Sequence, residues 1–308
     1  MTGAPRLSVS LRTYAAEAPE NWDDLFAMAR AADAAGIDRV VVSDHVVFGE
    51  NLEAYGNPES GGVEGGRQPT GPDGHWLEPL TVLTAVAAQT TRVRLGTYIL
   101  LAALRRPVVL AKQLATLDVI SGGRVDLGVG IGWQREEYEA AGLDFGARGR
   151  LLDHSLDVCQ TLWREQRASF SSPELNFEGI HSMPKPAHPD GVPIWVSGRC
   201  NERVAQRIAR FGNRWIPWGK DAADPAASIP RMREEVERAG GDGAALNVLA
   251  PLPLPRNQPV DLGAMERLPS LVEAGVTDFL AYVQVPNSSG ALDVYSELVA
   301  AFRDAATG

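Results

Sequence analysis

Residues 121–137 read SGGRVDLGVGIGWQREE, and this stretch indicates the fold. Its first residues are typical of a turn after a helix. Positions 124–129 alternate between polar and apolar residues and then become continuously apolar, as in a strand buried on both faces. Three glycines, Gly128, Gly130 and Gly132, leave the backbone open, so that a flat ring or a phosphate can approach main-chain N–H groups. The spacing GxGxG differs from the dinucleotide fingerprint GxGxxG, which weakens a Rossmann interpretation. A tight strand-to-helix turn without a ligand is the alternative.

On both sides of this stretch the chain alternates between strand and helix patterns. The predicted strands are 7–11, 39–43, 93–101, 125–129, 193–196, 215–217, 246–250 and 277–283. The predicted helices are 19–35, 77–90, 106–120, 149–163, 201–211, 225–239, 265–274 and 292–305. Three helix ends share a glycine followed by two linker residues and a strand, at Gly36, Gly212 and Gly275. Such repetition predicts an α/β fold, a (β/α)₈ TIM barrel formed as a single domain over residues 1–308. A doubly wound open sheet is the alternative.

Two long segments interrupt the alternation, at about 46–75 and 164–190. Segments of this length in a compact domain are usually lids or substrate-facing loops. We expect them to be insertions at the C-terminal face of the barrel, where the active sites of such barrels lie.

Composition excludes several classes of function. The 308 residues carry a formal net charge of −10, and no basic stripe is present, so nucleic acid is not an expected partner. No apolar run is long enough to span a membrane, and no export signal is recognisable. The cysteines, Cys159 and Cys200, are predicted to be free thiols in the cytoplasm, and no metal-ligand spacing occurs.

Asp44 and His45 end the second predicted strand, in VVVSDHV. At the end of a barrel strand such side chains face the mouth, where a histidine can move a proton near neutral pH. Alternatively, Asp44 caps the loop and His45 is a half-buried, satisfied imidazole. Ser197, Gly198 and Arg199 follow another strand and open a helix, which predicts an anion site, although a plain serine N-cap is also possible. The aromatic residues of the loops suggest an apolar or aromatic substrate pocket: Phe48, Tyr55, Trp76 and Trp133.

Four segments together resemble the bacterial luciferase-like superfamily of flavin and deazaflavin oxidoreductases. They are SDHV from Ser43, LGTYIL from Leu95, RRPVVLAKQLATLDVISGGRVDLGVGIGWQREEYEAAG from Arg105, and PKP with PIWVSGR from Pro184. The chain is most similar to the branch that depends on the deazaflavin coenzyme F420, because Asp44–His45 stands where many flavin monooxygenases have His-His. The resemblance implies a (β/α)₈ barrel, a homodimer and hydride transfer between C5 of the deazaflavin and a small organic substrate.

The resemblance also implies roles for individual residues. Asp44 and His45 would lie beside the reactive edge of the ring, with His45 as the proton donor or acceptor. A bulge with a cis Tyr98–Ile99 peptide would support the ring, formed by Thr97, Tyr98 and Ile99. Gly130, Ile131 and Gly132 would line the cofactor tail, and Ser197 with Gly198 would hold its phosphate.

One position departs from the sugar-phosphate dehydrogenases of that branch, which carry a glutamate where this chain has Trp133, so that substrate is not assigned. Two other functions stay open: a two-component FMN-dependent monooxygenase and a non-catalytic flavin-binding protein.

Overall fold

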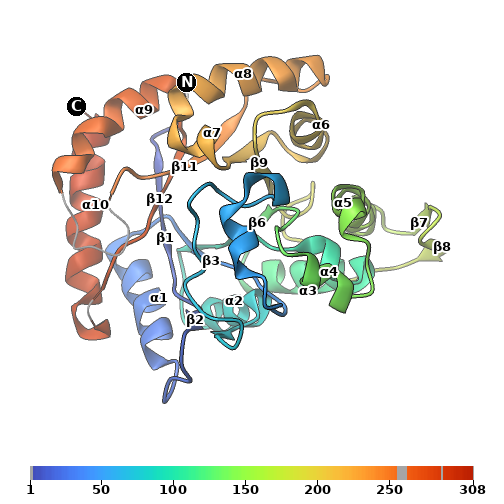
Figure 1. Cartoon of the computed structure of the whole chain (residues 1–308), viewed down its shortest axis with the longest axis horizontal. Coiled ribbons are helices and arrows are strands. Elements are labelled where there is room, and N and C mark those ends of the chain that lie inside the picture. The colour runs from blue at the N-terminus through green and yellow to red at the C-terminus, as the bar shows by residue number, and fades with distance from the viewer. Residues whose placement is uncertain (1–2, 255–261, 286, 308) are drawn as a thin grey trace.

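Eight parallel strands form a closed barrel in the computed structural model, which describes residues 3–254, 262–285 and 287–307. Around the barrel the strands follow the order β1, β12, β11, β10, β9, β6, β5 and β3 (Figure 1). Their bounds are β1 Arg6–Ser10, β3 Arg39–Val42, β5 Arg94–Thr97, β6 Val125–Val129, β9 Ile194–Gly198, β10 Arg214–Pro217, β11 Asn247–Pro251 and β12 Asp278–Ala281. The barrel predicted from the sequence is confirmed, and the open doubly wound sheet is wrong.

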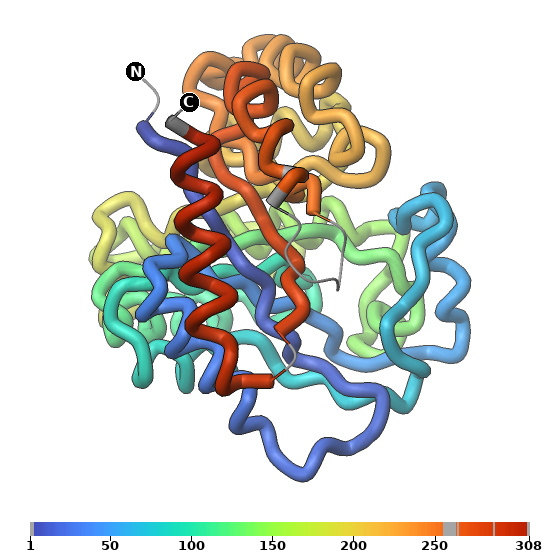
Figure 2. Tube along the Cα trace, turned by 90° about the vertical axis from the view of Figure 1, so that its left-hand side faces the viewer, coloured from blue at the N-terminus to red at the C-terminus, as the bar shows by residue number. Residues whose placement is uncertain are grey.

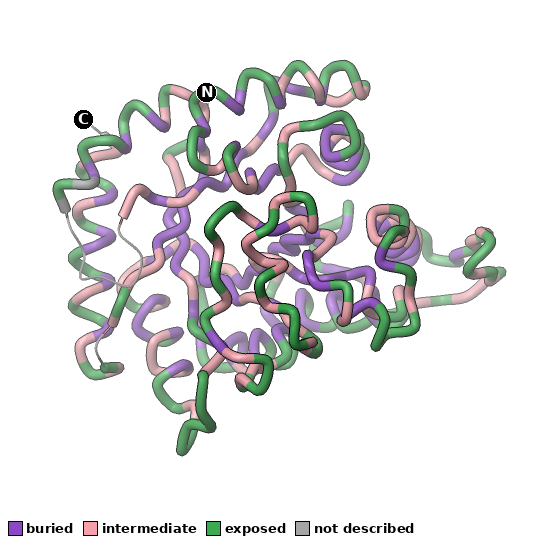
Figure 3. Tube along the Cα trace, in the orientation of Figure 1, coloured by how far each residue is buried: buried purple, intermediate pink, exposed green. Residues whose placement is uncertain are grey.

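Helices surround the barrel, and α10 runs alongside α1 to complete the ring, as the second view shows (Figure 2). The α-helices are α1 Asp23–Ala35, α2 Pro79–Ala87, α3 Pro107–Ile120, α4 Arg135–Ala140, α5 Arg148–Arg164, α6 Glu202–Phe211, α7 Lys220–Ala223, α8 Pro225–Arg238, α9 Leu268–Ala274 and α10 Ala291–Thr307. Short 3₁₀ turns are η1 Leu52–Gly56, η2 Pro58–Ser60, η3 Ala102–Leu104, η4 Phe145–Ala147, η5 Leu262–Arg267 and η6 Ser288–Gly290. Burial concentrates on the strands and on the inner faces of the helices (Figure 3).

Two of the repeated glycines end their helices in the left-handed conformation: Gly36 has φ 85° after α1 and Gly275 has φ 109° after α9. An L-residue adopts this φ only at a cost, which explains the glycine in each turn. The turn before β6 follows the same rule, because Gly122 and Gly123 have φ 70° and 82°. Arg124 then reaches back to the end of α2 and donates to the carbonyls of Ala87 and Thr90, both at 3.0 Å. The SGGR turn is therefore structural.

Side chains fill the barrel in layers because alternate strand residues face the axis. At the amino ends Arg39 is 2% exposed, and its Nε lies 2.7 Å from Asp126 and its guanidinium 3.1 Å from Asp278. Burial alone would raise the pKa of Asp126, but Arg39 and Arg94 outweigh it and hold that pKa well below its usual range. Above this ionic layer lies an apolar layer of Val41, Trp195, Ile216, Leu249 and Leu280.

The next inward positions, toward the carboxyl ends of the strands, include several small residues. Residues two positions apart along a strand face the same side. Val41 and Trp195 face the barrel axis, so Ser43 and Ser197, two residues further on, face it as well. Gly130, two residues beyond Gly128, takes the equivalent position after β6. Tyr98, Ile99 and Tyr282 pack on the apolar layer below. The ionic and apolar layers therefore fill the base of the barrel.

The segment 46–75 lies at the mouth, as expected. It contains η1, η2 and β4 His75–Trp76, which pairs antiparallel with β2 Tyr14–Ala15 beyond the end of β1. The second predicted insertion lies elsewhere. It forms the hairpin of β7 Ala168–Ser171 and β8 Asn176–Ile180 on the outer side of α5, at the right of Figure 1. Phe170 contacts His154 of α5, which fixes the hairpin there and not at the C-terminal face.

Candidate active site at the barrel mouth

Asp44 is fully engaged by neighbouring groups. Its carboxylate accepts the Leu101 N–H at 2.8 Å and both terminal nitrogens of Arg105, at 2.6 and 3.0 Å. The same guanidinium contacts Glu78 at 2.9 Å. Burial alone would lower the pKa of Arg105, but the two carboxylates hold it above its usual value. This geometry lets Asp44 fix the β3 end against the segment after β5, and three hydrogen bonds engage both of its oxygens.

His45 is paired with Glu137, a residue of α4. The imidazole Nδ1 lies 3.2 Å from Glu137 Oε2, and the other carboxylate oxygen accepts the Val46 N–H at 2.9 Å. The Glu137 side chain is 0% exposed and that of His45 10%. Because a carboxylate only accepts hydrogen bonds, Nδ1 is the nitrogen that carries hydrogen in this pair, which leaves Nε2 for another molecule.

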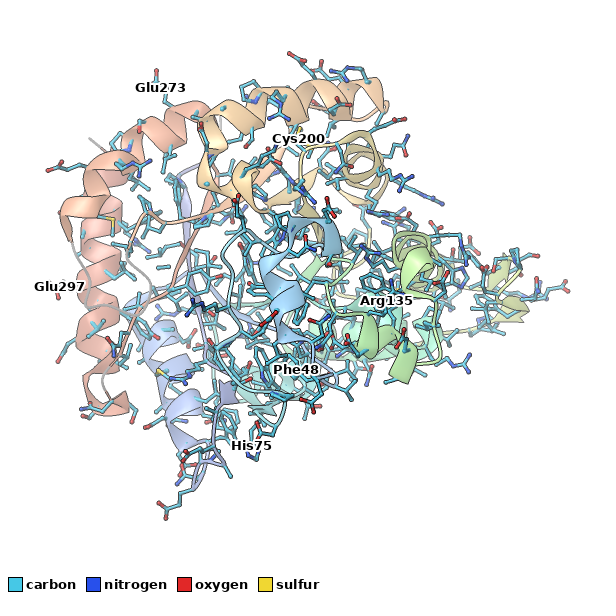
Figure 4. The ribbon with its side chains drawn as sticks, viewed as in Figure 1. Phe48, His75, Arg135, Cys200, Glu273 and Glu297 are labelled. Atoms are coloured by element: carbon cyan, nitrogen blue, oxygen red, sulfur yellow. The ribbon has the colours of Figure 1, made fainter. Side chains whose placement is uncertain are left out.

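Aromatic rings surround the imidazole. The ring centroids of Phe48, Trp76 and Trp133 lie 4.3, 4.8 and 5.8 Å from that of His45. Trp76 and Trp133 stand nearly perpendicular to it, at interplanar angles of 81° and 73°. Figure 4 labels Phe48 within this dense group of side chains, whereas Glu273 and Glu297 lie on the outer helices. The structure thus brings the predicted pocket residues Phe48, Trp76 and Trp133 together around the predicted proton-transfer residue.

The segment after β5 contains a cis peptide between Tyr98 and Ile99, as the family resemblance implied. Tyr98 donates its N–H to the Val42 carbonyl at 2.7 Å, and Leu100 donates to the Gly128 carbonyl at 2.7 Å. The Thr97 hydroxyl donates to the same Gly128 oxygen at 2.7 Å. These bonds place the predicted bulge 97–99 between the ends of β3 and β6, and they shorten the strand predicted at 93–101 to Arg94–Thr97.

The glycines after β6 have a packing role of their own. A Cβ on Gly128 would lie 2.0 Å from the Thr97 carbonyl oxygen, and one on Gly130 would lie 2.8 Å from Ile99 Cδ1. Gly132 has φ 68°. The bulge can therefore pack this closely on β6 and the loop after it only because these positions are glycine, whether or not a ligand binds. This packing role corresponds to the ligand-free tight turn that the sequence also allowed. Gly130 also faces Ser197, since its added Cβ would lie 3.7 Å from Ser197 Cβ.

The predicted anion site lies at the end of β9. Ser197 and Gly198 are half-buried final residues of that strand, and Asn201 caps α6 by accepting the Val204 N–H at 3.1 Å. The serine is thus not the helix cap, and no described hydrogen bond uses its hydroxyl as donor. Arg199 turns away to the insertion and donates to the Pro58 carbonyl at 2.5 Å. Its predicted contact with a cofactor stays a prediction.

Further contacts tie the insertion to the loops of the mouth. Trp218, just after β10, donates its indole N–H to the Gly61 carbonyl at 3.0 Å. Tyr55 lies between two tryptophans, with centroid distances of 5.4 Å to Trp133 and 6.4 Å to Trp218. The insertion therefore covers the β6, β9 and β10 side of the mouth.

Comparison with known proteins gives the family. A model of the luciferase-like monooxygenase family matches residues 6–258. The chain belongs to the luciferase-like monooxygenase family. An uncharacterized protein of Mycobacterium tuberculosis is 32% identical over 212 residues, which cover 68% of this chain and 74% of that protein. Membership in this family supports an oxidoreductase.

Solved structures agree on the fold. An F420-dependent secondary alcohol dehydrogenase, solved with an F420-acetone adduct, superposes with a TM-score of 0.74 at 18% identity and covers 98% of this chain and 100% of its own. Monooxygenase RslO1 from Streptomyces bottropensis gives a TM-score of 0.71 at 18% identity and covers 95% and 98%. At such identities the likeness shows the luciferase-like barrel alone, and it does not distinguish the two cofactors.

Sequence reasoning missed three residues of this luciferase-like mouth. Glu137 and Arg105 engage His45 and Asp44, and Trp218 holds the insertion. A signal existed for Glu137, because it lies in the charged run QREE that directly follows the glycine-rich loop and the predicted pocket residue Trp133. Arg105 and Trp218 belong to no motif that the sequence analysis recognised. Their partners become visible only when the barrel is closed.

Outside the mouth, a cleft of about 980 Å³ lies between α5 and the β7–β8 hairpin, with mixed acidic and basic walls. It contains none of the predicted site residues. Over the described ranges, no cluster of three or more His, Cys, Asp or Glu side chains is arranged to hold a metal ion. In the same ranges, no helix combines the length and apolar character that crossing a bilayer requires.

Proposed function

We propose that the chain is an oxidoreductase that depends on coenzyme F420 and acts on a small organic substrate. The observation that carries the proposal is the His45–Glu137 pair at the mouth of the barrel, next to the strand end that bonds to the segment after β5. Bound there, the deazaflavin would supply a hydride carrier.

The residues at the mouth fit such a group. Gly130 and Ser197 are small residues that face each other, since an added Gly130 Cβ would lie 3.7 Å from Ser197 Cβ, and the Ser197 hydroxyl donates no described hydrogen bond. The Ser197 hydroxyl and the N–H groups that follow it would hold a phosphate. Gly130, Ile131 and Gly132 would line the tail, and Thr97, Tyr98 and Ile99 would support the ring.

In this proposal His45 moves the proton. Glu137 holds Nδ1, so that Nε2 faces the substrate oxygen and accepts or returns its proton during hydride transfer. Asp44 is a positioning residue, because Arg105 and the Leu101 N–H occupy its oxygens while it anchors the strand end beside His45. The aromatic rings exclude water from the imidazole.

Titration with both cofactors tests the proposal. We expect F420 to bind more tightly than FMN in equilibrium dialysis, and His45→Ala to lower turnover about 10²-fold or more while the cofactor still binds. FMN binding without F420 binding, with oxygen consumption from reduced FMN, would instead identify an FMN-dependent monooxygenase, for which the match to the luciferase-like monooxygenase family is the supporting observation. A bound cofactor whose redox state no substrate changes would indicate a flavin-binding protein.

Two further expectations belong to this proposal. A homodimer and a cytoplasmic location follow from the family resemblance and the thiol content, and both stay predictions. Size-exclusion chromatography with light scattering measures the first.

A further inference from the structure

The walls around His45 present carbon surfaces and few hydrogen-bonding groups. Trp76 uses its indole N–H on the Thr70 hydroxyl at 2.9 Å, and its ring stacks on Tyr14 with centroids 4.4 Å apart. The β2–β4 pairing fixes the same two residues opposite each other. Trp218 likewise uses its indole N–H on the insertion. These tryptophans therefore offer a ligand their ring surfaces and no free donor.

Charged groups near His45 carry an excess of negative charge. Asp44 and Glu78 share the single guanidinium of Arg105, and the carboxylate of Glu137 bonds to His45 and to the Val46 N–H. Asp44 holds that guanidinium through two bonds, and Glu78 takes a third, so little of it is left to bind an incoming anion.

Two other arginines of the loops, Arg12 and Arg199, are exposed, and each bonds one backbone carbonyl. Arg199 donates to the Pro58 carbonyl of the insertion. Arg12 donates its Nε to the Tyr14 carbonyl at 3.2 Å and lies 5.3 Å from the centre of that ring. The buried carboxylate of Glu137 beside His45 repels an anionic ligand, and in a partly dry site this repulsion is weakly screened.

We propose that the substrate is a neutral molecule with a flat apolar or aromatic body and one oxygen function, a ketone or secondary alcohol, that reaches His45. This substrate class rests on the proposed function. The body would lie against Trp76, Trp133 and Phe48, and the oxygen would contact Nε2, the nitrogen that Glu137 leaves free. A carboxylate or a phosphate ester there would lie close to the buried Glu137 carboxylate, and the Arg105 guanidinium is already held by Asp44 and Glu78.

A matched pair of probes tests the charge requirement. Acetophenone and benzoylformate share a phenyl ketone and differ in a methyl group against a carboxylate. We expect acetophenone to bind the protein at least about tenfold more tightly in calorimetric titrations, since one unpaired buried charge costs more than the 1.4 kcal/mol of a tenfold change. Equal binding, or tighter binding of benzoylformate, would overturn the proposal.

Variants test the aromatic wall. Trp133→Ala and the milder Trp133→Phe should weaken acetophenone binding, the former by about fivefold, as for loss of one aromatic contact. Phe177→Ala, in the hairpin outside α5, is the matched control and should leave binding unchanged. Unchanged binding in both Trp133 variants would place the substrate elsewhere.

These probes bind or fail to bind irrespective of the cofactor, which keeps the two proposals separable. F420 affinity is measured by fluorescence in parallel. If F420 does not bind but acetophenone still binds more tightly than benzoylformate, the cofactor proposal is refuted and the substrate class stands. If F420 binds but acetophenone is not preferred, the substrate class alone is refuted.

Discussion

Replacing Glu137 by glutamine tests whether this carboxylate sets the protonation of His45. The amide oxygen can still accept the Val46 N–H, which now bonds to Glu137 at 2.9 Å, so the loop keeps its anchor. The amide group would then present N–H donors to Nδ1, 3.2 Å away in the native pair. Glutamine therefore favours the tautomer with hydrogen on Nε2, the nitrogen that must accept the substrate proton.

The size of the effect follows from the bond that is lost. A hydrogen bond to a charged group contributes about 1.5–3 kcal/mol, which corresponds to about 10- to 150-fold in rate if the bond acts in the transition state. We expect kcat to fall within that range in steady-state assays that follow deazaflavin absorbance, with F420 affinity changed less than about twofold. The pH–rate profile should also change, because glutamine offers Nδ1 a donor in place of the carboxylate acceptor.

A double mutant separates positioning from mere structure. If Glu137 acts through His45, the variant with both His45→Ala and Glu137→Gln should be no slower than His45→Ala alone. Glu139→Gln, an exposed change on the same helix α4, is the control and should keep full activity. An unchanged kcat and pH profile in Glu137→Gln, or additive losses in the double mutant, would refute the reasoning.

Three further predictions follow from the described contacts. Asp126→Asn should lower the free energy of unfolding in urea by about 3–5 kcal/mol at neutral pH, because it leaves a buried guanidinium with one carboxylate fewer. The folded-state pKa of Asp126 is lowered, so its contribution to the free energy of unfolding is fully present above the usual carboxyl pKa of about 3.9 and is lost as the pH falls below that value. The difference in unfolding free energy between Asp126→Asn and wild type should therefore shrink in acid. Ser197→Ala should weaken F420 binding by about 1–2 kcal/mol in dialysis, and an unchanged dissociation constant would place the phosphate elsewhere. Gly128→Ala should destabilise the protein by about 1–3 kcal/mol or more, because its Cβ would lie 2.0 Å from the Thr97 oxygen, whereas Gly3→Ala, with no atom within 4 Å of its added Cβ, should not shift Tm.

The sequence by itself determined the barrel. Every barrel strand overlaps a segment whose apolar pattern predicted it, because a parallel strand buried on both faces must be apolar along its length. Glycine marks the turns at Gly36 and Gly275, where the backbone needs a positive φ. Element ends were less accurate: the helix predicted at 77–90 is Pro79–Ala87, since Glu78 caps it by accepting the Thr81 N–H.

Only the tertiary structure decided which side chains of the site contact one another. His45 and Glu137 are 92 positions apart, and Asp44 and Arg105 are 61 apart. Periodicity along a chain records which face of an element is buried, but it does not record which side chains of different elements meet, because that depends on barrel closure and strand register. For the same reason the two long segments looked alike in sequence, although β4 pairs with β2 at the mouth and the β7–β8 hairpin packs outside α5.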